Sequence, residues 1–168
     1  TQLVWVDQIA CSGEEKRRIG DWVGGLVLGG QGGGALLAVG EGKSRWTCKA
    51  RLPSKQREVV AEALINVLRP YKKQVETVTL DNGNEFAQHV NVSKDLQASV
   101  YFAHPYCAWQ RGLSENTNGL LRQYFPKGTN FKIIRQAKLD QIQKRLNQRP
   151  RKGLDFLTPQ QIFQPERS

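Results

Sequence analysis

The sequence contains no methionine and begins with threonine, so we expect the chain to be a piece of a longer protein. Its three cysteines, Cys11, Cys48 and Cys107, stand far apart, and no Cys-x-x-Cys pair occurs, which argues against a structural zinc site. The two histidines are too few for a mixed His/Cys metal site. Unpaired thiols are typical of a reducing compartment, and we therefore expect a cytoplasmic protein.

Long apolar runs are also missing. No stretch reaches the length of a membrane-spanning helix and no signal peptide opens the chain, so no membrane partner is expected. The run Gly29–Gly34 holds five glycines in six residues, which predicts a flexible turn. This run lacks the lysine-containing pattern of a nucleotide-binding phosphate loop, so no nucleotide cofactor is expected.

What the chain does have is positive charge gathered in one segment. Its 168 residues, enough for one domain with a hydrophobic core, carry a net charge of +10. Eleven lysines and arginines but only Glu115 and Asp140 fall between Arg111 and Lys152, so this segment holds nine of the ten net charges. Basic character alone does not identify a nucleic-acid binder, but its concentration in one segment favours a phosphate-bearing partner.

The apolar pattern predicts a mixed α/β fold. A meander of three strands is followed by alternating helices and strands and then by further helices. The strands are expected at 20–28, 35–39, 44–52, 75–80 and 99–103, and the helices at 53–69, 84–96, 113–124, 135–147 and 158–163. Residues 1–19 are interpreted as an N-terminal connector with an extended start, and residues 20–168 as one folded domain.

Two carboxylates are distinguished by their positions. Asp81 follows the strand 75–80, and ligands commonly bind at the carboxyl ends of strands in α/β folds. Glu115 stands near the start of the helix 113–124, with 33 residues between it and Asp81. Each has a simpler interpretation, because Asp81 precedes an Asn-Gly turn and Glu115 suits the positive end of a helix. If both take part in chemistry, they suit divalent cations in phosphodiester cleavage.

The surroundings of these carboxylates also suit nucleic acid. Helical spacing gives Glu115 a face shared with Asn118, Gly119 and Arg122. The opposite, core-facing side is expected to hold Leu113, Thr117, Leu120, Leu121 and Tyr124. Before the helix, Trp109 is available to stack on a base and Arg111 to hold a phosphate, although tryptophan more commonly packs in a core. On the strand, alternation predicts one face for Val75, Thr77, Thr79 and Asp81.

Three stretches carry a family resemblance: TVTLDNGNEFAQH from Thr77, VYFAHPYCAWQRGLSENTNGLLRQYFPKGTNF from Val100 and RLNQRPRKGLDFLTPQQIF from Arg145. With the shorter pieces IGDW, GKSRWT and ARLPSK, they resemble the catalytic domain of bacterial insertion-sequence transposases. The specific group is named after insertion sequence thirty and lies within the DDE transposase and retroviral integrase superfamily. The resemblance runs from about Ile19 to Phe163, and the spacing of Asp81 and Glu115 is the one expected of this group.

The resemblance implies a ribonuclease-H-like fold, which is a five-stranded mixed sheet flanked by helices. It implies cleavage at transposon ends with Mg²⁺, or Mn²⁺ as its substitute, followed by attack of the freed 3′-OH on target DNA. It also implies a homo-oligomer on DNA and an upstream helix-turn-helix region, which is absent from this sequence. The residues expected to contact DNA are Lys43, Arg45, Asn82, Trp109, Arg111, Asn118, Arg122 and Lys127.

The first strand departs from the family pattern. The resemblance assigns the first catalytic aspartate to the position of Gly25 and a glutamate to the position of Val23. Asp21 lies on the same face but about 13 Å along the strand from Gly25, and Glu41 is expected on a mobile loop between glycines, so neither is expected to substitute. With two of three carboxylates left, we predict an impaired or inactive transposase domain. A non-catalytic DNA-binding or assembly remnant is the alternative, and another ribonuclease-H-like nuclease is a more distant one.

Overall fold

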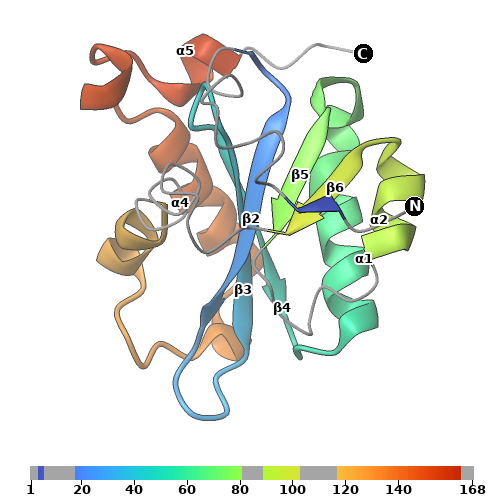
Figure 1. Ribbon diagram of the computed structural model, residues 1–168. Helices are drawn as coiled ribbons and strands as arrows, with labels where there is room; N and C mark the ends of the chain where they lie inside the picture. The colour runs from blue at the N-terminus through green and yellow to red at the C-terminus, as the bar shows by residue number, and fades with distance from the viewer. Residues whose placement is uncertain (1–3, 6–17, 81–88, 103–116, 164–168) are drawn as a thin grey trace.

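The computed structural model describes residues 4–5, 18–80, 89–102 and 117–163, and a mixed sheet forms its centre (Figure 1). The strands lie in the order β1-β6-β5-β2-β3-β4. Their bounds are β1 Val4–Trp5, β2 Asp21–Leu28, β3 Ala35–Glu41, β4 Thr47–Leu52, β5 Thr77–Leu80 and β6 Ser99–Phe102. β3 is antiparallel to β2 and β4, whereas β5 is parallel to β2 and β6, and β6 to β1. The predicted five-stranded mixed sheet is confirmed, and β1 adds a short strand at its edge.

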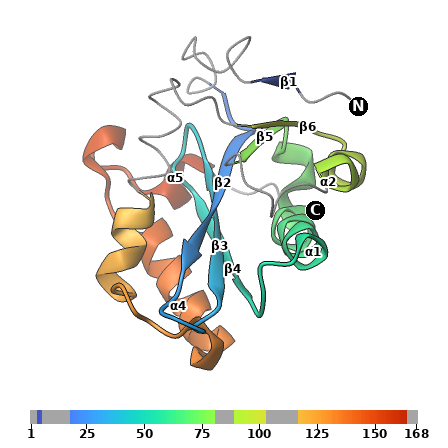
Figure 2. The same cartoon turned by 60° about the horizontal axis from the view of Figure 1, so that its bottom comes forward.

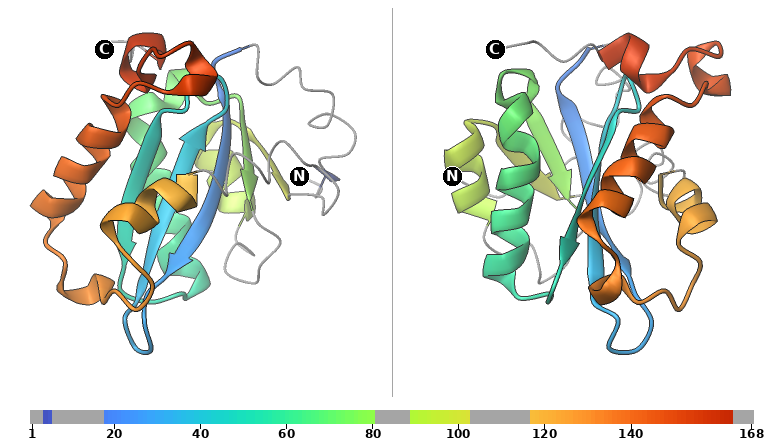
Figure 3. Two further views of the ribbon diagram at one scale, coloured as in Figure 1. Left: turned by 90° about the vertical axis from the view of Figure 1, so that its left-hand side faces the viewer. Right: turned by 180° about the vertical axis from the view of Figure 1, so that it is seen from behind.

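Helices cover both faces of the sheet (Figures 1 and 3). One face carries α1 (Arg57–Leu68), the 3₁₀ turn η4 (Arg69–Gln74) that follows it, and α2 (His89–Leu96). The other face carries the helical residues 117–124 and α4 (Gln136–Asn147). The 3₁₀ turns η6 (Phe131–Ile133) and η7 (Lys152–Leu154) precede and follow α4, and α5 (Pro159–Phe163) lies at one end of the sheet. Figure 2 shows the sheet separating the two sets of helices.

Alternation along the strands divides the core between these two faces. On β3, Leu37 and Val39 pack on the α1 side, while Leu36 and Ala38 pack on the α4 side. The α1 side includes an aromatic group whose contacting rings have centres 5.1–6.1 Å apart, made of Trp22, Trp46, Tyr71 and Phe163. Phe163 thereby attaches α5 to the sheet. Within the described ranges, no helix combines the length and the apolar character needed to cross a membrane.

β2 forms from Asp21 to Leu28, one residue shorter than predicted, although Gly24 and Gly25 were expected to weaken it. It pairs with β3 from Trp22 to Leu28 and with β5 from Asp21 to Gly24. Pairing on both edges offsets the conformational freedom of the two glycines. A Cβ atom on Gly24 would lie 3.2 Å from Cδ2 of Leu80, so this position also has little room for a side chain.

Two predicted element starts are wrong, and in each case a local turn takes the place of the element. β4 begins at Thr47 and not at 44, because residues 42–46 form the turn after Glu41. α1 begins at Arg57 and not at 53. Its N-cap residue Gln56 is extended, and the Gln56 N–H donates to the hydroxyl of Ser54 over 3.4 Å. Such side-chain bonds to nearby backbone compete with helix formation.

The predicted face of the fourth strand needs one correction. Thr77 and Thr79 lie within β5, but Val75 precedes it and packs with the α1-side core. Val75 therefore does not share the face of the two threonines. The first residues of the predicted helices 84–96 and 113–124 lie outside the described residues. The helices α4 and α5 match the predicted helices 135–147 and 158–163 to within one residue.

Candidate active site

The centre of the candidate site is the parallel pair of β2 and β5. Val23 pairs with Thr79 and Gly24 with Leu80, the last described residue of β5. The next residue on β2 is Gly25, which is buried and contributes no side chain. The next residue in the chain after Leu80 is Asp81, which lies outside the described residues. The two strands thus lead in register to the two positions that the family resemblance assigned to catalytic aspartates.

The helical residues 117–124 cross the sheet close to this pair. Gly40 of β3 pairs with Val23, and a Cβ atom on Gly40 would lie 3.6 Å from Oγ1 of Thr117. The first described turn of the helix therefore lies over β2 and β3, two positions before Gly25. Glu115 precedes Thr117 by two residues in the sequence and lies outside the described residues.

The orientation predicted for this helix is confirmed where it is described. Leu121 is fully buried, and Leu120 and Tyr124 pack against the same α4-side cluster. On the opposite side, Gly119 is exposed, and no atom lies within 4 Å of the position of an added Cβ. Asn118 is half-buried. The helix thus keeps one face in the core and leaves space at Gly119.

Asp21 lies at the other end of β2 and has its own partners. Its carboxylate accepts hydrogen bonds from Nε and Nη2 of Arg18 at 2.9 and 3.0 Å and from Oγ1 of Thr77 at 2.8 Å. It is 2% exposed, and it pairs along the sheet with Thr77 rather than with the end of β5. Four residues along a strand separate it from Gly25 by about 13 Å. Asp21 therefore stabilises the start of β2.

Glu41 corrects a prediction, because it is not on a mobile loop. It is the last residue of β3 and is completely buried. Its carboxylate accepts hydrogen bonds from the backbone N–H groups of Gly20, Lys43 and Ser44 and from the Ser44 hydroxyl at 2.7–3.3 Å. Burial raises the pKa of the Glu41 carboxyl group, while these donors oppose the rise. Glu41 thus holds the β3–β4 turn and lies near the Asp21 end of β2.

The described residues do not form a metal site. Within the ranges given above, no three His, Cys, Asp or Glu side chains are grouped so that they could hold a cation. The two buried carboxylates, Asp21 and Glu41, already accept hydrogen bonds from the protein. Position 25, where a ligand is expected, carries no side chain. The described part of the chain therefore does not fit a complete two-cation centre.

Of the residues predicted to contact DNA, those that the structure describes are spread along β2 and do not form one patch. Lys43 is exposed and Arg45 half-buried in the β3–β4 turn, near the Asp21 end. Arg122 and the exposed Lys127 lie near the Leu28 end. Asn82, Trp109 and Arg111 lie outside the described residues.

Arg122 has a structural role that the sequence did not reveal. Arg122 donates from Nη2 to the carbonyl of Leu28 at 2.8 Å and from Nη1 to the carbonyls of Phe125 and Pro126 at 3.4 Å. It therefore fastens its helix to the end of β2. Arg45 has a positive φ of 65°, and burial lowers the pKa of its guanidinium while the charge of Glu41 raises it.

The curated proteins whose sequences are similar to this chain include transposases of bacterial insertion sequences. The chain is 39% identical over 150 residues to the transposase for insertion sequence element IS4351 of Bacteroides fragilis, covering 89% of this chain and 46% of that protein. It is 39% identical over 152 residues to the transposase InsI for insertion sequence element IS30A of Escherichia coli K12, covering 90% of this chain and 39% of that protein. No model of a protein family matches the chain. The chain thus spans less than half the length of these curated relatives.

Solved structures agree on the fold. The catalytic core domain of BIV integrase matches with a TM-score of 0.65 and 20% identity, over 86% of this chain and 93% of that one. A simian T-cell lymphotropic virus intasome chain matches with a TM-score of 0.69 and 18% identity, over 89% of this chain and 56% of that one. The predicted ribonuclease-H-like fold is therefore confirmed. Over most of its length the chain is related to insertion-sequence transposases of the IS30 kind, and it has the fold of an integrase catalytic core.

Proposed function

We propose that this chain is the DNA-acting core of an insertion-sequence transposase whose cleavage and strand-transfer chemistry is impaired by Gly25. The observation that carries the proposal is the register of β2 with β5. It pairs Gly24 with Leu80, the residue that precedes Asp81, so Gly25 is the next residue along β2. Gly25 and Asp81 each follow this pair by one residue in the sequence, and position 25 carries no carboxylate.

The missing carboxylate has no replacement among the described residues. Asp21 and Glu41 lie three to four strand residues away and are held by Arg18, Thr77 and the β3–β4 turn. Loss of one positioned catalytic group typically raises a barrier by about 3–4 kcal/mol. Mg²⁺ or Mn²⁺ would have Asp81 and Glu115 as its remaining carboxylate ligands. We therefore propose that this chain binds DNA, and we assign no cleavage step to it.

DNA binding is supported by charge and by the relatives. Nine of the ten net positive charges lie between Arg111 and Lys152, a segment that includes the helical residues 117–124 and α4. The similar curated proteins are named transposases, and one structural neighbour is part of an intasome. We propose transposon ends and target DNA as ligands, with self-association on DNA in a bacterial cytoplasm. A remnant that binds DNA and supports assembly without chemistry is the second candidate, favoured by Gly25 itself.

The test repairs position 25. Gly25→Asp is compared with Gly25→Asn, which has nearly the same shape but no charge, in the full-length protein with its DNA-reading region. Nicking of a supercoiled plasmid carrying the cognate ends is measured with Mg²⁺ and with Mn²⁺. We expect activity from Gly25→Asp, little from the unchanged protein or Gly25→Asn, and loss of the repaired activity when Asp81→Asn is added.

Two results would contradict the proposal. If Gly25→Asp binds DNA but stays inert, the assignment of Asp81 and Glu115 to chemistry is wrong and the remnant interpretation stands. If the unchanged chain nicks as fast as Gly25→Asp, position 25 is not a catalytic position. DNA affinity is measured in parallel against salt concentration, because phosphate contacts make affinity fall steeply with salt. A flat salt response would remove the argument from charge.

A further inference from the structure

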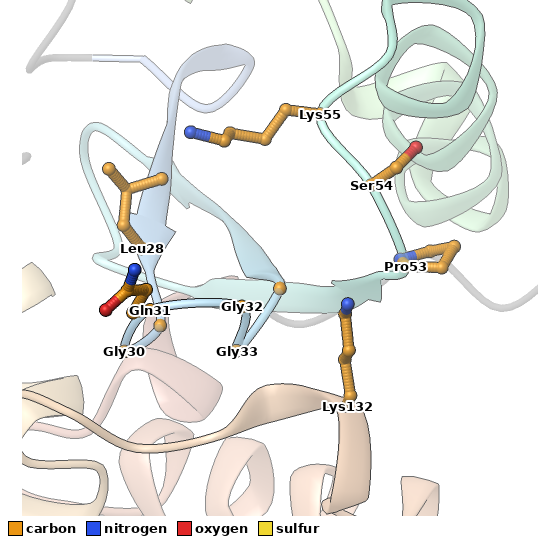
Figure 4. A pocket seen from close by; sticks show the side chains of 11 residues that line it. Leu28, Gly30, Gln31, Gly32, Gly33, Pro53, Ser54, Lys55 and Lys132 are labelled. Carbon is orange, nitrogen blue, oxygen red and sulfur yellow. The ribbon is translucent and has the colours of Figure 1, made fainter.

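A pocket of about 310 Å³ lies where β2 turns into β3, at the opposite end of β2 from Asp21 and Glu41 (Figure 4). The glycine-rich hairpin Gly29–Gly34 forms one wall, and the connection from β4 to α1, residues 53–55, forms the other. Leu28 and Lys132 complete the lining. The glycine run that sequence analysis treated as a simple turn is therefore part of a concave surface.

The walls of this pocket are fixed by hydrogen bonds and packing. The hairpin is fastened to the segment before η6, because Gly30 N–H donates to the Thr129 carbonyl at 3.0 Å and Phe131 N–H to the Gly33 carbonyl at 2.8 Å. Phe131 is completely buried in the α4-side core, which holds the neighbouring Lys132 in place. Gly34 has a φ of +71°, and a Cβ atom there would lie 3.2 Å from Cγ of Lys132, so glycine is required beside the lysine stem.

The pocket presents positive charge and hydrogen-bond donors. Figure 4 shows Lys55 reaching across the opening from the β4–α1 connection and Lys132 pointing into it from below. None of the described residues that line it is acidic. Among the described residues, the backbone N–H groups of Gln31 and Gly32 at the hairpin tip donate no hydrogen bond to the protein. Nothing lies within 4 Å of the position of an added Cβ on Gly32, so the tip is open.

A helix begins close in sequence to one wall of the pocket. α1 begins at Arg57, just after Ser54 and Lys55, and its N-cap Gln56 makes no side-chain capping bond. Uncapped N–H groups at a helix start favour an anion nearby. Glu58 in the first turn of α1 is the acid nearest in sequence, and it does not line the pocket. Two lysines and open backbone donors therefore line one cavity, and α1 begins two residues beyond Lys55.

We propose that this pocket binds a backbone phosphate of DNA. Lysine ammonium groups and backbone N–H groups are common phosphate ligands, and such contacts position a duplex without reading its sequence. Leu28 is three residues beyond Gly25 on β2, which is about 10 Å. This distance corresponds to the rise of about three base pairs along the axis of a duplex. The phosphate in the pocket is thus not the reacting one, so the pocket contributes to DNA affinity and leaves the chemical step alone. This inference rests on the proposed function.

The experiment measures the affinity of this chain for a fluorescent 30-base-pair duplex over a range of salt concentrations. Lys55→Gln with Lys132→Gln is compared with Lys72→Gln with Lys73→Gln. The control lysines are exposed in η4, beyond the far end of α1, so the change in net charge is identical. We expect the pocket pair to weaken binding about tenfold and to lower the salt slope by about one unit, the value for one lost phosphate contact. The control pair is expected to change affinity by less than about threefold.

A second comparison isolates charge from shape at the hairpin tip. Asparagine and aspartate both tolerate a positive φ, and Gly32 has a φ of +71°, so Gly32→Asn and Gly32→Asp impose similar strain. Gly32→Asp is expected to weaken DNA binding several-fold more than Gly32→Asn. Thermal melting of each variant checks that it remains folded.

The outcomes separate the two proposals. If the chain binds DNA with a steep salt response but the pocket pair behaves as the control pair does, the pocket assignment is overturned and the proposed function stands. If the unchanged chain does not bind DNA, the proposed function fails and this inference fails with it. A third arm uses inorganic phosphate at constant ionic strength. If phosphate raises the melting temperature through Lys55 and Lys132 while DNA affinity is unaffected by their loss, the pocket holds a free anion and the assignment to DNA is wrong.

Discussion

Replacing Lys49 with methionine should make this protein more stable. Lys49 lies on β4 beneath α4 and is 5% exposed, and within the described chain its Nζ makes no hydrogen bond. Burial lowers the pKa of its ammonium group from 10.5 to about 7, while the charge of Asp140 on α4 opposes this change. The Lys49 N–H group, which donates to Oε1 of Gln143 at 3.1 Å, is unaffected by the substitution. Methionine keeps most of the buried carbon atoms and removes the charge.

The size and the pH range of the effect follow from the pKa. A lowering from 10.5 to about 7 corresponds to roughly 4–5 kcal/mol of unfavourable free energy for the charged form. Because a long lysine stem can turn its end toward water, we expect about half of this, roughly 2 kcal/mol, to be recovered by Lys49→Met. The unfolded chain holds the proton more tightly than the folded one, so stability of the unchanged protein rises with pH between about 7 and 10.5. The gain from Lys49→Met is therefore largest below pH 7 and shrinks as pH rises through this range.

The assay is urea unfolding at pH 6, 8 and 10, with Lys138→Met as the control because Lys138 is exposed on α4. At pH 6 the free energy of unfolding should rise by about 2 kcal/mol for Lys49→Met and change by less than about 0.5 kcal/mol for the control. Melting temperature should rise by about 4–8 °C, as expected for a chain of this length. A loss of stability at every pH, or a gain of the same size at pH 6 and pH 10, would refute the argument from a buried, unpaired charge.

Two further substitutions test other contacts. Asn147 is buried beneath the sheet, and its amide group accepts from the Thr47 N–H at 2.8 Å and donates to the Thr47 carbonyl at 2.9 Å. Asn147→Leu leaves both backbone groups unpaired and should lower the free energy of unfolding by about 2–4 kcal/mol in urea titrations, with an unchanged m-value. Asp21→Asn loses the ion pair with the half-exposed Arg18 and should cost only about 1 kcal/mol. When Asp21→Asn is added to the Gly25→Asp protein, the rate of DNA nicking should stay unchanged. A large loss of nicking would show that Asp21 takes part in chemistry.

Much of the sheet could be predicted because its strands are short, apolar runs bounded by glycine, proline and charged residues. β5 was predicted from Val75 to Leu80 and occupies Thr77–Leu80, and β6 was predicted at 99–103 and occupies Ser99–Phe102. The similarity to transposases was also predictable, because three long sequence motifs identify a protein family more specifically than any single residue does. Placement of Asp81 and Glu115 remains a prediction from sequence, because both lie outside the described residues.

The residues that were misread are polar groups whose environment is set by distant parts of the chain. Glu41 between two glycines suggests a loop, yet donors from Gly20 and Ser44 turn it into a buried anchor. On β4, Thr47 and Lys49 alternate with apolar residues, and both are nevertheless buried. The helix α4, which lies nearly 90 residues later in the sequence, packs over these residues, and the local sequence of β4 does not predict this contact.

The two faces of β2 explain how a chain can keep this fold with glycine at position 25. One face carries Trp22, which is completely buried among the aromatic rings. The other face carries Val23 and Gly25, where the family resemblance assigns a glutamate and an aspartate. Grouped carboxylates repel one another and lose hydration when buried, so an active site of this kind opposes folding. Replacing them removes that opposition and leaves the Trp22 face and the pairing with β3 intact. The proposed loss of chemistry at β2 therefore needs no compensating change elsewhere, and the proposed DNA-binding pocket at the Leu28 end does not depend on position 25.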